Sequence, residues 1–149
     1  MSWLAVMIGG AAGCALRFAI GTWLTPSSLD FPWTTLVVNV TGSLALGFLG
    51  RYFAPPHASH SLFLLLTVGF CGGYTTFSTF TLDTFTLVER GAPLRAAIYA
   101  IASMLASYVA LVAGYLAARS LRSICSTRRY KARRPMEPAR LFMRIANSE

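Results

Sequence analysis

The feature that most constrains the fold is a polar interruption inside an apolar segment, over residues 69–80. There the pair Gly72-Gly73 precedes four serine and threonine residues, within a stretch otherwise suited to a membrane helix. Irregular backbone at membrane depth persists only where protein or a water-filled cavity covers it. The segment therefore predicts a helix that is broken near the bilayer centre, where main-chain carbonyl and amide groups become available.

The composition places the chain among integral membrane proteins. Of its 149 residues, 55% are hydrophobic and only 12% are charged. A soluble domain carries about twice that charged fraction. The three cysteines show no metal-ligand spacing, so core packing is their expected role. The N-terminus lacks the basic segment of a signal peptide, and the apolar stretch after it has full membrane length.

Four stretches are long enough to cross the hydrocarbon, which takes about 20 apolar residues. They cover about residues 3–24, 33–53, 62–89 and 93–119, and the third contains the break. Turn signals rich in proline separate the first two stretches, and Pro55-Pro56 ends the second. The predicted fold is therefore an all-α membrane protein with four transmembrane helices. Residues 1–121 form the membrane domain, and residues 122–149 form a basic tail.

Positive charge is concentrated at the C-terminus. Nine of the thirteen basic residues lie in the last 31 positions: Arg119, Arg122, Arg128, Arg129, Lys131, Arg133, Arg134, Arg140 and Arg144. Such a tail is typical of a cytoplasmic end that rests on anionic lipid. Nucleic-acid binding is not expected, because aromatic residues are not interleaved with these charges.

Small residues mark close helix packing. The first span contains Gly9, Gly10 and Gly13, and the second contains Gly42, Gly47 and Gly50. Small residues at such spacing let helix backbones approach one another in a membrane. They indicate packing within the chain and between copies of it.

Polar residues recur at every fourth position in two spans: Thr35, Asn39 and Ser43 in the second, and Tyr99, Ser103 and Ser107 in the fourth. That spacing puts each set on one helix face. Hydrogen bonding between helices explains any single hydroxyl. The Asn39 amide is costly to leave unpaired in hydrocarbon, and together with the break it favours a polar path through the membrane.

Two charged residues lie inside spans. Arg17 either extends to the interface or lines an aqueous vestibule that attracts anions. Asp83 follows the break by two turns and either pairs with Arg17 or caps a vestibule. The chain shows no phosphate loop, nucleophile elbow or zinc-protease motif, so transport or a structural role is expected rather than catalysis.

These motifs resemble the Fluc (CrcB) family of fluoride channels over about residues 5–121. Residues 72–80 are similar to the family's GGxTTFSTF signature. Thr34 to Asn39, followed by Gly42, and the pair Gly13 and Arg17 support the resemblance in the same order. Asp83 stands where the family often has glutamate.

The resemblance implies a passive fluoride channel in the cell inner membrane, built as an antiparallel, dual-topology homodimer. It further implies a structural sodium ion at the dimer centre, held by the main-chain carbonyls of Gly72 and Thr75 from both copies. The implied fluoride pathway comprises Phe77, Phe80, Asn39, Ser78, Thr79, Tyr99, Ser103, Ser107, Thr35 and Arg17. Ring edges carry partial positive charge and attract a small anion without trapping it.

The distribution of charge complicates such a dimer. Ten basic residues (Arg51 and the nine of the tail) lie on the C-terminal side, against Arg90 and Arg95 on the opposite side. This bias favours one orientation. Either the chain tolerates dual insertion, which we favour, or it pairs with an oppositely oriented paralogue.

Two other functions remain as alternatives. A small four-helix multidrug or cation exporter would require an acidic residue in the first span, which has none. A membrane structural or assembly protein would leave the break and its clustered hydroxyls unexplained.

Overall fold

The computed structural model describes residues 2–24 and 31–133, and every regular element within them is helical. The order along the chain is α1 (Ser2–Trp23), α2 (Trp33–Tyr52), α3 (His60–Leu64), the π-helix η1 (Leu65–Cys71), α4 (Gly72–Tyr74), α5 (Phe77–Glu89) and α6 (Pro93–Arg133). Four helical stretches are long and apolar enough to cross a membrane: Ser2–Trp23, Trp33–Tyr52, His60–Glu89 and Pro93–Ser123. The all-helical, four-span prediction is confirmed.

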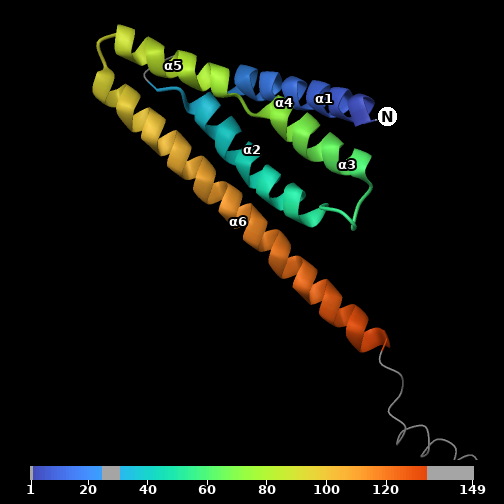
Figure 1. The fold of residues 1–149 in the computed structure, drawn as a ribbon. Coiled ribbons are helices and arrows are strands. Elements are labelled where there is room, and N and C mark those ends of the chain that lie inside the picture. Colours follow the sequence, from blue (N-terminus) through green and yellow to red (C-terminus); the bar gives the residue numbers. More distant parts are fainter. Residues whose placement is uncertain (1, 25–30, 134–149) are drawn as a thin grey trace, which may run out of the picture. The chain divides into compact units, whose positions relative to one another are not determined.

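Glycines let α1 pack directly against the first half of the third span. A Cβ atom on Gly9 would collide with the Leu65 carbonyl, and one on Gly13 would collide with the Phe70 carbonyl. In return, Gly73 lies against the Gly10 carbonyl. The glycine cluster of the first span therefore serves packing within the chain, and Figure 1 shows α1 beside α3 and α4.

A second glycine contact joins α2 to α6. Gly47 faces the Leu111 carbonyl, and Gly114 faces the Leu44 carbonyl, so each helix presents a glycine to the backbone of the other. Gly42 faces the side chains of Tyr74 and Thr75, which brings α2 to the break as well. Helix α2 thus contacts both the broken span and α6, as Figure 1 shows.

The break lies three residues later than the glycine pair suggested. Gly72 is helical, with φ −65° and ψ −37°, and α4 continues to Tyr74. The extended residues are Thr75, with ψ 158°, and Thr76, with φ −149° and ψ 115°. Of residues 72–75, which the glycine pair predicts to be unwound, only Thr75 is extended, because Gly73 packs against the α1 backbone and Gly72 stays helical.

The fourth helix also extends further than expected. Helix α6 continues past residue 121 to Arg133. Residues 120–134 contain no glycine or proline, so nothing in the local sequence stops the helix before Pro135. The expectation for the rest of the tail, residues 134–149, lies outside the described residues. By its internal contacts, residues 1–119 form one compact unit and residues 120–149 another.

Candidate functional site

The break is held open by Asn39 of α2. The Thr76 N–H donates to Asn39 Oδ1 at 2.8 Å, and Asn39 Nδ2 donates to the Thr76 carbonyl at 3.1 Å. The main-chain groups fix the amide orientation, because an N–H needs an oxygen and a carbonyl needs an N–H. One side chain therefore bonds to both main-chain polar groups of an extended residue at the break.

The contact between Asn39 and Thr76 also affects the Gly72 carbonyl, which lies before the break. In a continuous helix the Thr76 N–H would bond to the Gly72 carbonyl, four residues earlier. Here that N–H is directed to Asn39 instead, which leaves the Gly72 carbonyl without its helical donor. Asn39 was predicted as an amide donor to an anion. The structure shows that its amide holds the backbone of Thr76.

Thr76 caps the second half of the span. Its Oγ1 accepts the Thr79 N–H at 3.1 Å, and it lies 3.0 Å from Thr79 Oγ1 and 3.1 Å from Ser78 Oγ. Threonine is a favoured N-cap residue, because its oxygen satisfies a first-turn N–H. The sequence prediction included Ser78 and Thr79 but not Thr76, although a threonine directly before an apolar helix is a recognisable cap signal.

Arg17 of α1 reaches the break from the other side. Its Nη1 donates to the Thr75 carbonyl at 3.1 Å, and its Nη2 lies 3.7 Å from Cys14 Sγ. Of the alternatives considered from sequence, neither extension to the interface nor pairing with Asp83 matches this contact. The guanidinium instead places positive charge directly beside the interruption.

Aromatic rings line the start of α5. The Phe77 and Phe80 ring centroids lie 5.6 Å apart, and the Phe80 ring lies 5.5 Å from that of Tyr99. Phe80 is 9% exposed, whereas Phe77 is 75% exposed. The two phenylalanines therefore differ: Phe80 belongs to a core with Tyr99, while Phe77 presents its ring at the surface of the chain.

The hydroxyl-bearing residues Tyr99, Ser103 and Ser107 lie along one face of α6, and Tyr99 packs against Phe80. Tyr99 is fully buried, and Ser103, one turn later, is 4% exposed. Among the described residues, none forms a hydrogen bond with the buried Ser103 Oγ. Ser107 is half-buried a further turn along. The structure thus packs Tyr99 against Phe80 and buries Ser103 one turn further along the same face of α6.

Asp83 accepts hydrogen bonds from polar residues of two other helices. The Thr35 hydroxyl donates to Asp83 Oδ2 at 2.6 Å, and the Tyr99 hydroxyl donates to the same oxygen at 3.4 Å. Helices α2, α5 and α6 therefore converge on a single carboxylate. The sequence placed Asp83 near a vestibule or Arg17 but gave no sign that these two hydroxyls would point to it.

Comparison with known proteins agrees with these features. The family model described as CrcB-like protein, Camphor Resistance (CrcB), matches residues 4–115. The chain is 49% identical over 125 residues to the Fluoride-specific ion channel FluC of Nitrobacter winogradskyi, a match covering 76% of this chain and 94% of that protein. It is 44% identical over 129 residues to Fluoride-specific ion channel FluC 1 of Nitrobacter hamburgensis, covering 81% of this chain and 100% of that protein. Since the family model spans most of the chain, including the break, the chain belongs to the CrcB-like protein family.

Proposed function

We propose that this chain conducts fluoride passively across the cell inner membrane and so lowers cytoplasmic fluoride. The observation that carries the proposal is the break at Thr75 and Thr76. It puts the carbonyl end of α4 and the amide end of α5 next to one another, with the aromatic rings and hydroxyls of the next turn beside them. The relatives that match most of the chain are named as fluoride-specific channels.

The amide end of α5 suits an anion. Helix N-termini carry partial positive charge, and the edges of the Phe77 and Phe80 rings carry more. Fluoride accepts hydrogen bonds, so hydroxyl donors such as Ser103 and Ser107 replace part of its water shell. Conduction requires such binding to be weak and repeated along the path. The spacing of single donors along α6 meets that requirement.

The carbonyl end of α4 suits a cation. We assign the Gly72 and Thr75 carbonyls as ligands of a structural sodium ion, since carbonyls at a helix break are natural sodium ligands. The Gly72 carbonyl lacks its helical donor, and the Thr75 carbonyl, which accepts from Arg17, keeps a second lone pair. The nearby guanidinium charge reduces the expected affinity for sodium.

The exposed start of α5 supports an antiparallel dimer. Phe77 is 75% exposed, and Ser78 and Thr79 are exposed beside it, directly at the break. Polar groups and an uncovered ring at membrane depth call for a covering surface. A second copy in the opposite orientation covers this face with its own broken span. An oppositely oriented paralogue would do the same.

The first test of the function is fluoride efflux from liposomes that contain the purified chain. We expect passive release of fluoride and retention of chloride, measured with ion-selective electrodes. Replacing Phe80 by isoleucine removes the ring edge and should lower fluoride flux by up to about tenfold, with assembly unchanged on size-exclusion chromatography. A folded wild type that releases no fluoride would exclude the proposed channel.

The second test concerns orientation. Reporters fused to the C-terminus, one active only inside the cell and one only outside, should both give signal if the chain inserts both ways. The excess of basic residues near the C-terminus predicts that the cytoplasmic orientation dominates. Signal on one side alone would replace the homodimer with a pair formed by two different chains. The exporter alternative is not favoured, because the described first span offers no carboxylate to bind a cation.

A further inference from the structure

The Thr35 and Tyr99 hydroxyls were both predicted to bind fluoride, but in the structure they donate their hydrogens to Asp83. Each hydroxyl has one hydrogen, and both donate to Asp83 Oδ2. Fluoride can only accept hydrogen bonds, so neither hydroxyl serves it while the carboxylate holds it. The Thr35 bond, at 2.6 Å, has the short length of a strong bond to a charged oxygen, whereas the Tyr99 hydroxyl, at 3.4 Å, is held more weakly.

Asp83 lies directly beside the aromatic part of the path. It follows Phe80 by one helical turn, and its partner Tyr99 packs on the Phe80 ring with centroids 5.5 Å apart. Ser103, one turn further on the same face of α6, has a buried oxygen that bonds to none of the residues the structure describes. Of this cluster, Ser103 is the hydroxyl that is not bonded to the carboxylate.

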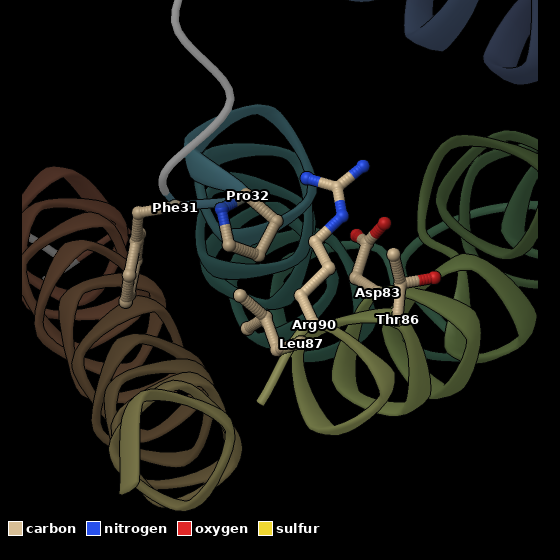
Figure 2. A pocket seen from close by; sticks show the side chains of 6 residues that line it. All are labelled: Phe31, Pro32, Asp83, Thr86, Leu87 and Arg90. Atoms are coloured by element: carbon tan, nitrogen blue, oxygen red, sulfur yellow. The ribbon is translucent and has the colours of Figure 1, made fainter. Parts of the chain in front are cut away.

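Asp83 lines a cavity at the end of α5. The cavity has a volume of about 110 Å³ and is lined by Phe31, Pro32, Asp83, Thr86, Leu87 and Arg90. Figure 2 shows the side chains of Asp83 and Arg90 on the same side of α5. Its volume accommodates a few waters, since one occupies about 30 Å³ in the liquid. A positive and a negative side chain thus line the same small space.

We propose that Asp83 is a positioning residue that keeps anion binding in the pathway weak. It withdraws two hydroxyl hydrogens from the anion and adds negative charge one turn from Phe80. The Asp83 carboxylate lines the same cavity as Arg90, so its negative charge opposes the retention of an anion there. This inference rests on the proposed fluoride channel and adds a reason why a path rich in donors does not trap its ion.

Asp83→Asn is the direct test, because it keeps the shape of the side chain and removes its charge. A neutral amide competes less well with fluoride for the Thr35 and Tyr99 hydrogens, and it no longer repels the anion. Both changes tighten binding. We expect the fluoride concentration that gives half-maximal efflux to fall about tenfold, and the maximal rate to fall with it.

Three variants separate this role from a general packing defect. Asp83→Glu restores the carboxylate and should restore the wild-type concentration dependence. Combining Asp83→Asn with Tyr99→Phe removes one freed hydrogen and should reverse part of the gain in affinity. Thr84→Val changes the residue next to Asp83 without touching these bonds or the cavity lining, since the Thr84 hydroxyl donates to the Phe80 carbonyl, and should leave efflux unchanged.

The outcomes distinguish this inference from the function on which it rests. A wild type that passes no fluoride overturns both. A conducting wild type whose half-maximal concentration is unchanged or raised by Asp83→Asn overturns the inference alone. If Asp83→Asn fails to assemble, Thr35→Val decides: it leaves the carboxylate charge less compensated and should raise the half-maximal concentration, whereas a fall would contradict the role of Asp83.

Discussion

Replacing Asn39 by leucine is expected to destabilise the protein by about 2–5 kcal/mol and to abolish fluoride flux. Asn39 accepts the Thr76 N–H and donates to the Thr76 carbonyl. Leucine leaves both groups unpaired at membrane depth, where water is scarce and each unsatisfied group is costly. Thermal unfolding in detergent measures the loss of stability, and liposome efflux measures the loss of flux.

The matched control is Ser43→Ala, one turn along the same polar face of α2. Ser43 is half-buried and lies on the predicted polar path, so it shares the environment of Asn39 without holding the break. A change within about 0.5 kcal/mol is expected there. If Asn39→Leu proved as mild as Ser43→Ala, the backbone at Thr76 would have to be satisfied in another way.

The positions of the helices could be predicted because each depends on local sequence. Apolar length sets the four spans, and Pro32 and Pro93 stand directly before or at the start of α2 and α6. The existence of a break was equally predictable from the hydroxyl cluster. These features follow from composition and spacing within a single segment, so no knowledge of distant contacts was needed.

The location of the break could not be predicted in the same way. A Gly-Gly pair is compatible with an unwound backbone and also with a tightly packed helix. The choice depends on what faces it, and here the α1 backbone lies against Gly73. The extended residues come later, at Thr75 and Thr76, where Asn39 of another helix supplies the missing hydrogen bonds.

In the candidate site, too, the sequence predicted which residues take part but not the contacts between distant segments. The sequence identified Phe80, Tyr99 and Ser103, and the structure packs Tyr99 against Phe80 and buries Ser103 one turn further along α6. The direction of a hydroxyl hydrogen is a tertiary property, so the commitment of Thr35 and Tyr99 to Asp83 was not predictable from spacing. The same holds for Arg17, whose carbonyl partner lies 58 residues away.

The second large effect is expected at the glycine pair itself. Gly73→Ala should destabilise the protein by about 3 kcal/mol or more, because its Cβ atom would collide with the Gly10 carbonyl of α1. The obstacle is main chain on both sides, so a rotamer change cannot relieve it. The measurement is the thermal unfolding midpoint in detergent, together with the yield of folded protein.

Gly72→Ala is the control that separates close packing from backbone freedom. No atom within 4 Å faces a Cβ at Gly72, and its dihedral angles are helical, so alanine should be neutral or stabilising by up to about 1 kcal/mol. If the pair instead supplied freedom for an unwound backbone, both substitutions would be similarly harmful. A large loss at Gly73 with none at Gly72 therefore assigns Gly73 to helix packing and leaves the opening of the span to Thr75, Thr76 and Asn39.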